Sequence, residues 1–117
     1  MDIKTLKIIL SKSWDKDSCY PPMKKGWSLK KPAYGQCHCT ALVVNDYLGG
    51  KILKYKFKDG SEHYSNYING KEIDLTRSQF DQNEEFPKPA VIERKDTKNT
   101  KEYLILKERV KEFLKKS

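Results

Sequence analysis

The chain has 117 residues, the length of one domain, so we expect a single domain over residues 1–117. A hydrophobic fraction of 37%, with 2 Trp, 7 Tyr and 4 Phe, excludes a disordered chain. No apolar run approaches the roughly 18 residues that a membrane helix needs, and the first residues lack the pattern of a signal peptide. We therefore expect a cytoplasmic protein without a membrane partner.

The formal net charge is +8, which raises the question of a nucleic-acid partner. The basic residues are 21 lysines and 3 arginines, and the lysines are spread along the whole chain. Proteins that read nucleic acids favour arginine, because its guanidinium group bonds phosphates and guanine edges in pairs. We interpret the charge as a solvated lysine-rich surface, with a basic protein- or nucleic-acid-binding module as the alternative.

The first half of the chain predicts two helices joined by a long loop. Apolar residues at helical spacing predict an amphipathic helix over residues 3–13. Residues 14–36 hold three prolines and two tryptophans without periodicity, and a loop of this length is often functional. A second helix is predicted over residues 37–48, ended by Gly49-Gly50.

The second half predicts strands at residues 52–57, 62–68 and 71–75, connected by turns at Asp59-Gly60 and Asn69-Gly70. Residues 84–95 are predicted to be extended, and Asn99 with Glu102 predicts a capped helix that ends near residue 115. The fold class is therefore α+β. We expect one helix packed on a small antiparallel meander, with the N- and C-terminal helices completing the layer.

Cys37 is the first candidate for chemistry, because it begins a predicted helix. The positive end of the helix dipole and the free N–H groups of the first turn favour a thiolate there. On the helix surface Cys37 shares a stripe with Ala41 and Val44, whereas Cys39 lies about 200° away. We expect Cys37 to face the sheet, Cys39 to lie on the flank, and Cys19 to have no base nearby.

His63 and Asp74 are the second and third candidates. If Asn69-Gly70 forms a two-residue loop, His63 lies diagonally opposite Asp74 on the same face of the sheet. A carboxylate at that place orients the imidazole and stabilises its charged form. A helix-tip cysteine with a strand histidine and an aspartate predicts a cysteine-nucleophile site made of Cys37, His63 and Asp74.

The opposite face of the predicted meander is the more apolar one. With two-residue loops at both turns it carries Leu53, Tyr55, Phe57, Tyr64, Ile68, Ile73 and Leu75. A helix that covers this face would not meet His63 directly. We therefore expect either a bulge in the sheet or an approach of the cysteine helix near the sheet edge.

The run Tyr34-Gly35-Gln36-Cys37 is similar to the nucleophile motif of transglutaminases and of the papain-like superfamily. A fuller pattern resembles a family of small bacterial proteins, the YunG-like proteins, and it covers nearly the whole chain. That pattern is carried by Trp27, Pro32-Ala33, Gly35-Gln36-Cys37, residues 40–44, Gly49-Gly50, His63-Tyr64, Asn66, residues 74–77 and Gln79-Phe80.

The wider resemblance implies a papain-like or transglutaminase-like core that hydrolyses or transfers acyl groups at an amide or thioester. Where papain-like proteases place the oxyanion-hole glutamine, this chain has Lys30-Lys31. The donor would then be Gln36, Trp27 or the backbone N–H of Cys37. We also expect Trp27 and Tyr34, in the long loop, to line or cover the site.

A zinc site is the other chemistry that the cysteines suggest. Cys37-His38-Cys39 could bind zinc together with Cys19 or His63, but the paired spacing of structural zinc sites is missing. We therefore predict neither a metal nor another cofactor. The alternative to an enzyme is a binding module that retains a degenerate papain-like site, and the sequence does not identify the amide or thioester substrate.

Overall fold

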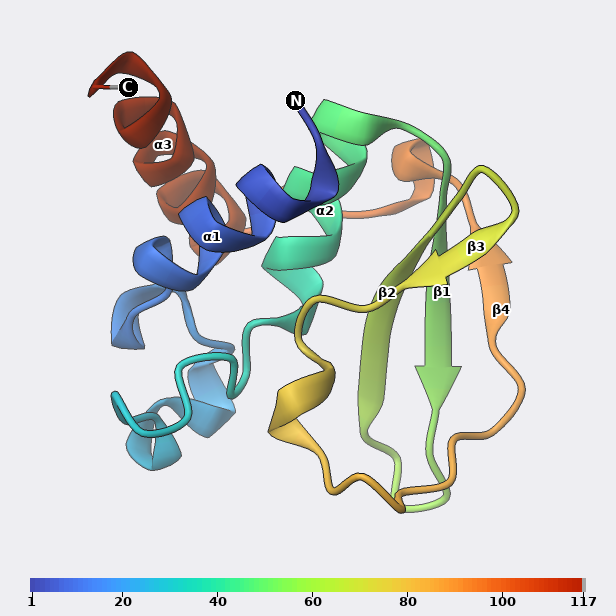
Figure 1. The fold of residues 1–117 in the computed structure, drawn as a ribbon. Coiled ribbons are helices and arrows are strands. Elements are labelled where there is room, and N and C mark those ends of the chain that lie inside the picture. Colours follow the sequence, from blue (N-terminus) through green and yellow to red (C-terminus); the bar gives the residue numbers. More distant parts are fainter. Residues whose placement is uncertain (117) are drawn as a thin grey trace.

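The structure, a computed structural model, describes residues 1–116 and has an α+β fold. An antiparallel sheet packs on one side of a central helix, α2, and the two terminal helices, α1 and α3, pack on its other side (Figure 1). The strand order in the sheet is β3-β2-β1-β4. The elements are α1 (Ile3–Ser13), α2 (Cys37–Leu48), β1 (Lys51–Lys56), β2 (Glu62–Ile68), β3 (Lys71–Ile73), β4 (Ala90–Ile92) and α3 (Lys101–Lys116).

Helix α2 is the centre of the core and begins and ends at the predicted residues. All six residues from Cys39 to Val44 are buried, which exceeds the single inward stripe expected from the sequence. The reason is that α2 has neighbours on both sides, the sheet on one and the terminal helices on the other. The Trp14 indole N–H, at the end of α1, donates to Thr40 Oγ1 at 2.8 Å.

The C-terminal helix is predicted correctly except for its cap. The Tyr103 N–H donates to the Thr100 side chain at 3.2 Å, so Thr100, and not Asn99, caps α3. Tyr103, Leu106 and Val110 form its buried stripe. None of the helices in residues 1–116 is long and apolar enough to cross a membrane.

The sheet contains the predicted meander and one further strand. β4 pairs with β1, opposite Ile52 and Leu53. The sequence missed this strand because it is only three residues long and follows the two prolines of the 84–95 stretch. β3 ends at Ile73, two residues earlier than predicted, so Asp74 lies just beyond the strand.

The two turns of the meander differ in length. Ile68 pairs with Lys71, so Asn69-Gly70 is the predicted two-residue loop, and both residues have the positive φ that a type I′ turn requires. The predicted length of the other turn, at Asp59-Gly60, is wrong. Lys56 pairs with Glu62, which leaves five residues, 57–61, in the loop. An odd loop reverses the expected side-chain alternation of β1 relative to β2.

As a consequence, Leu53 and Tyr55 lie on the same face as His63, because Tyr55 pairs with His63 and Leu53 with Ser65. The expectation that they share the face of Tyr64 is wrong. The helix-covered face carries Ile52 and Asn66, and the Asn66 side chain donates to the Ala41 carbonyl of α2 at 2.9 Å.

Candidate functional site

Cys37 is the first residue of α2 and is half-buried. It lines a pocket of about 780 Å³ between the loop that precedes α2, the beginning of β2 and the segment that leads into α3. Other residues around this pocket include Tyr20, Met23, His38, Glu62, Tyr64 and Ile92. The structure therefore places the predicted nucleophile at a helix N-terminus and at an accessible surface.

His63 and Asp74 are paired in the way that the two-residue turn predicts. The His63 Nε2 lies 2.6 Å from Asp74 Oδ2. The other carboxylate oxygen, Oδ1, accepts hydrogen bonds from the Thr76 backbone N–H at 3.2 Å and from the Thr76 hydroxyl at 3.3 Å. The carboxylate is thus held on both oxygens, and it fixes the orientation of the imidazole.

The imidazole of His63 is fully buried, at 0% exposure. Two phenylalanines of the segment after β3 contact it edge to face, Phe80 at 4.8 Å and Phe86 at 5.4 Å between ring centroids. Arg77 closes this segment, because its guanidinium lies 3.8 Å from the Phe86 ring centroid and donates to the Glu84 carbonyl at 3.0 Å. The segment keeps water away from one side of the imidazole.

The surroundings of His63 favour its charged form. Burial acts to lower its pKa, but the hydrogen bond to Asp74 and the interaction with the Cys37 thiol outweigh burial and raise the pKa to about 9. Within the described chain the Nδ1 atom of His63 is buried and makes no hydrogen bond. A positively charged imidazole is thus placed near the Cys37 thiol at the N-terminus of α2.

The helix meets His63 near the edge of the sheet, one of the two arrangements predicted. β3 pairs only with residues 66–68 of β2, so none of the strands in residues 1–116 lies beside His63 on that side. The chain from Asp74 to Phe80 runs there instead and contacts the imidazole. α2 begins at the same end, which brings Cys37 into interaction with His63 although α2 covers the other face of the sheet.

The other two cysteines are buried away from this arrangement. The Cys39 sulfur lies against the carbonyls of Ser18 and Gln36, each at 3.4 Å, under the long loop. The Cys19 sulfur lies 3.4 Å from the Tyr34 carbonyl. Burial raises the pKa of both thiols, so both remain protonated. Cys39 therefore lies on the flank, as the helix phase predicts.

This difference between the cysteines gives a first prediction. We expect iodoacetamide at pH 7 to modify Cys37 at least about tenfold faster than Cys19 or Cys39, because only a thiolate attacks and buried thiols are inert. Mass spectrometry of tryptic peptides measures the three rates, and Cys19→Ala and Cys39→Ala should leave the Cys37 rate unchanged. Fastest modification at Cys39 would contradict the placement of the helix.

Gln36 does not point into the site. Its side-chain N–H donates to the Asp15 carbonyl at 2.9 Å and its Oε1 accepts from the Ser18 hydroxyl at 2.8 Å. The side chain is fully buried, and it fastens the long loop to the beginning of α2. The amide is thus already bonded elsewhere, and the backbone N–H of Cys37 is left as the oxyanion donor among those predicted.

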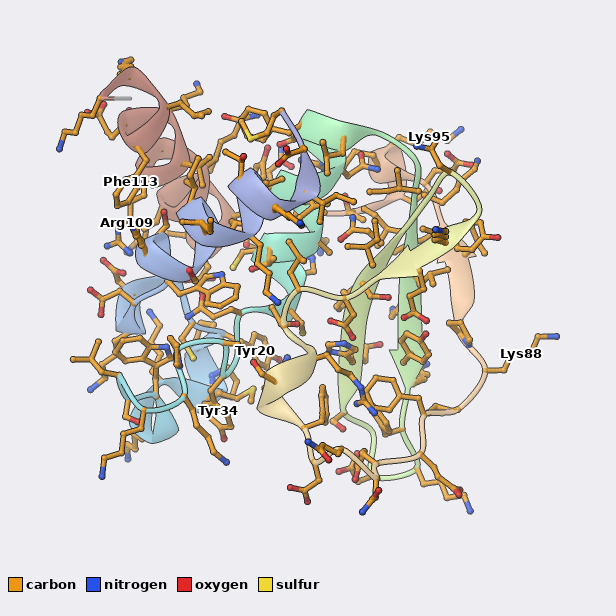
Figure 2. The ribbon with its side chains drawn as sticks, in the orientation of Figure 1. Tyr20, Tyr34, Lys88, Lys95, Arg109 and Phe113 are labelled. Atoms are coloured by element: carbon orange, nitrogen blue, oxygen red, sulfur yellow. The ribbon has the colours of Figure 1, made fainter. Side chains whose placement is uncertain are left out.

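Trp27 and Tyr34 also lie elsewhere than expected. The Trp27 indole N–H donates to the Pro32 carbonyl at 3.0 Å, within its own loop, and Tyr34 packs against Gly26. Neither residue lines the pocket that holds Cys37, whereas Tyr20 of the same loop does. Figure 2 labels Tyr20 and Tyr34 on this part of the chain. Sequence spacing placed the loop correctly but could not tell which aromatic side chains turn toward the site.

Sequence reasoning gave no role to the residues that surround the histidine and aspartate, although Thr76 and Phe80 belong to the YunG-like pattern. Thr76 lies two residues after Asp74, and an aspartate that accepts from the N–H two residues on is a recognisable Asx turn. Phe80 and Phe86 carry no such local signal, because they reach His63 only when the chain folds back over the sheet.

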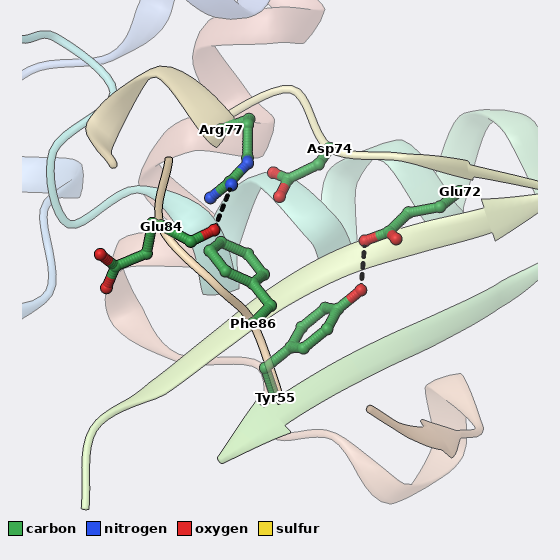
Figure 3. Close-up of a pocket in the computed structure, with 6 residues that line it drawn as sticks. All are labelled: Tyr55, Glu72, Asp74, Arg77, Glu84 and Phe86. Carbon is green, nitrogen blue, oxygen red and sulfur yellow. Dashed lines mark hydrogen bonds between the residues drawn. The ribbon is translucent and has the colours of Figure 1, made fainter. Parts of the chain in front are cut away.

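The aspartate also faces a second pocket, of about 420 Å³, which Cys37 does not line (Figure 3). Glu72 lies beside Asp74 on its wall and accepts hydrogen bonds from Tyr55 at 2.6 Å and Ser65 at 2.7 Å. These bonds hold Glu72 away from the imidazole. Asp74 is therefore the carboxylate bonded to His63, although a second one lies two residues before it.

The described residues do not form the zinc site that the cysteines suggested. Among them no three His, Cys, Asp or Glu side chains come together in a way that could hold a metal ion. Cys39 and Cys37 point to different surroundings, with Cys39 facing backbone carbonyls.

Comparison with known proteins assigns the family. The model of the family described as "YunG protein" matches residues 2–115. The chain belongs to the YunG family. The YunG-like resemblance drawn from the sequence is thereby confirmed.

One relative in this family is the protein named "Uncharacterized protein YunG" of Bacillus subtilis (strain 168). It is 41% identical over 75 residues, which cover 64% of this chain and 60% of that protein. The chain thus matches less than two thirds of the relative's length. No solved structure matches the chain. The family assignment rests on the family model, and the α+β fold on the helices and strands described above.

Proposed function

We propose that this YunG-family protein is a cysteine-nucleophile hydrolase or acyltransferase that acts on an amide or thioester. Cys37 is the nucleophile, His63 the general base and acid, and Asp74 the group that orients His63. The observation that carries the proposal is the buried imidazole of His63. It is bonded to Asp74 at 2.6 Å, and this bond together with the Cys37 thiol raises its pKa.

The proposed reaction has two steps. In the first, the Cys37 sulfur, whose proton His63 Nδ1 has taken up, bonds the substrate carbonyl carbon. The carbonyl oxygen, now negative, accepts a hydrogen bond from the Cys37 N–H, and the leaving amine or thiol takes the proton from His63. In the second, water or another acceptor gives a proton to His63 and attacks the acyl carbon. The bond between that carbon and the Cys37 sulfur then breaks, the acyl product leaves, and the proton on His63 is again shared with Cys37.

The order of the three residues supports a papain-like or transglutaminase-like mechanism, with cysteine on a helix, histidine on a following strand and aspartate after the next. The Nδ1 atom without a hydrogen bond supports its assignment as the base, because Nε2 is occupied by Asp74. The substrate would enter through the pocket that Cys37 lines.

Acylation of Cys37 tests the proposal. We expect wild-type protein incubated with a small acyl thioester to gain one acyl group on Cys37, seen by intact-mass and peptide mass spectrometry. Hydroxylamine should remove it, and Cys37→Ala should not be labelled. Thioester turnover that persists in Cys37→Ala would overturn the nucleophile assignment.

A second prediction concerns the aspartate. We expect Asp74→Asn to slow acylation of Cys37 by about tenfold or more, because an amide cannot stabilise the imidazolium and can leave the wrong tautomer. Glu72→Gln, a change of the same chemistry in the neighbouring carboxylate, is the matched control and should stay within about twofold. Equal losses in both variants would contradict a specific role for Asp74.

The alternative, a basic binding module with a degenerate site, has one supporting observation. Residues 18–45 contain no acidic side chain, and the loop before α2 carries Lys24, Lys25, Lys30 and Lys31. Salt-dependent retention on heparin, lost when these lysines are changed to glutamine, would favour it. A chain that binds heparin and whose Cys37 reacts no faster than free cysteine would establish the alternative.

A further inference from the structure

We propose that Gln79 is a positioning residue that couples the loop carrying the nucleophile to the His63–Asp74 pair. This inference rests on the function proposed above. It concerns a chain of hydrogen bonds from Gly35, two residues before Cys37, through Gln79 and Thr76 to Asp74.

The first link fixes the loop. The Gly35 backbone N–H donates to the Gln79 Oε1 at 3.2 Å. Gly35 has a φ of +71° and its carbonyl accepts from the Tyr20 N–H at 2.8 Å, so the peptide groups around it are held from two directions. A Cβ at this glycine would lie 2.4 Å from the Cys19 sulfur, which leaves the backbone no freedom for another side chain.

The second link reaches the aspartate. Gln79 Nε2 donates to the Thr76 hydroxyl at 3.2 Å, and that hydroxyl donates in turn to Asp74 Oδ1 at 3.3 Å. Thr76 is buried, so water does not compete for its hydroxyl. The aspartate's other oxygen bonds His63, so the chain ends at the imidazole.

The direction of these bonds explains why a glutamine stands at this position. The carbonyl oxygen of the amide accepts from Gly35, and the amide nitrogen donates to Thr76, which leaves the single hydroxyl proton for Asp74. A glutamate at this position could accept from Gly35 but could not donate to Thr76. It would compete with Asp74 for the hydroxyl proton of Thr76, and a hydroxyl that donates to the glutamate no longer donates to Asp74.

The chain joins the loop before Cys37 to the carboxylate that orients His63. Cys37 and His63 come from different elements, and their relative position decides whether the proton can pass between them. Gln79 links the backbone before Cys37 to Asp74, the carboxylate that orients His63. We therefore expect Gln79 to act on the alignment of the pair, and not on the substrate.

A double-mutant cycle tests the chain, with the rate of Cys37 alkylation by iodoacetamide as the readout, since this needs no substrate. We expect Gln79→Ala and Thr76→Val each to slow alkylation at pH 7 by about threefold to tenfold, the range for loss of one hydrogen bond. The double variant should be no slower than the slower single variant, because both changes break the same chain. Thr76→Ser, which keeps the hydroxyl, should restore most of the rate.

Controls separate this inference from the proposed function. Gln82→Ala, at an exposed glutamine of the same segment, should leave the rate and its pH profile unchanged. Additive effects in the double variant, or rates like wild type in Gln79→Ala and Gln79→Glu, would overturn the chain alone if His63→Ala still slows alkylation. If His63→Ala has no effect either, the proposed function fails as well.

Discussion

His63→Ala should slow the alkylation of Cys37 by about 100-fold at pH 6. At this pH an ordinary thiol is only about 0.3% thiolate, whereas a thiolate–imidazolium pair holds the cysteine in its reactive form. Part of the gain is offset, because a more stable thiolate is a weaker nucleophile. The measurement is the second-order rate constant with iodoacetamide across pH 5 to 9, in a background that lacks Cys19 and Cys39.

His38→Ala is the matched control, because His38 follows Cys37 in α2 and lines the same pocket. Its imidazole packs edge to face on Tyr64 at 4.9 Å, and burial with the nearby Arg94 lowers its pKa. We expect its removal to change the rate by about twofold at most. A His63→Ala variant as reactive as wild type at pH 6 would remove the basis for the cysteine–histidine pair.

The second large effect is on stability. In a Cys37→Ala variant no thiol exchanges a proton with His63, and the hydrogen bond to Asp74 is the interaction that raises the pKa of His63 above its ordinary value of about 6.5. Folding of this variant binds a proton, and the stability that results is fully present below pH 6.5 and is lost as pH rises above that value. Between pH 6.5 and 8.5 we expect a loss of about 1 kcal/mol, measured by urea denaturation.

The difference between Cys37→Ala and the double variant Cys37→Ala/His63→Gln isolates this contribution, because the double variant has no imidazole at position 63. The loss attributed to His63 should disappear in the double variant. Other groups act in other intervals: His38, with its lowered pKa, matters at lower pH, and the buried thiols matter above about pH 8.5. A Cys37→Ala protein as stable at pH 8.5 as at 6.5, relative to the double variant, would show that the bond to Asp74 does not raise the pKa of His63.

Local signals predicted most of the fold. The boundaries of α1 and α2 and the Asn69-Gly70 turn follow from apolar spacing and from glycines at element ends. The five-residue turn at residues 57–61 was wrong, because Asp59-Gly60 is also a strong two-residue turn signal. The loop is closed by a hydrogen bond from the Phe57 N–H to the Ser61 carbonyl at 2.9 Å.

The candidate site was predictable where one register or one helix phase decides it. The pairing of His63 with Asp74 follows from a two-residue turn, and the separation of Cys37 from Cys39 follows from helix geometry. The orientation of Gln36 and Trp27 was not predictable, since their partners are carbonyls that only the folded loop brings near. Roles in catalysis stay predictions until the reactivity of Cys37 is measured.

The hairpin of β2 and β3 carries both His63 and Asp74, separated by only eleven residues. Closing a loop this short costs little chain entropy, so the pair can form early in folding, as a local event. Cys37 joins later, when α2 docks across the sheet through contacts such as that of Asn66 with Ala41. The appearance of a fast-reacting thiol during refolding is therefore expected to time the docking of the helix, after the hairpin has already formed.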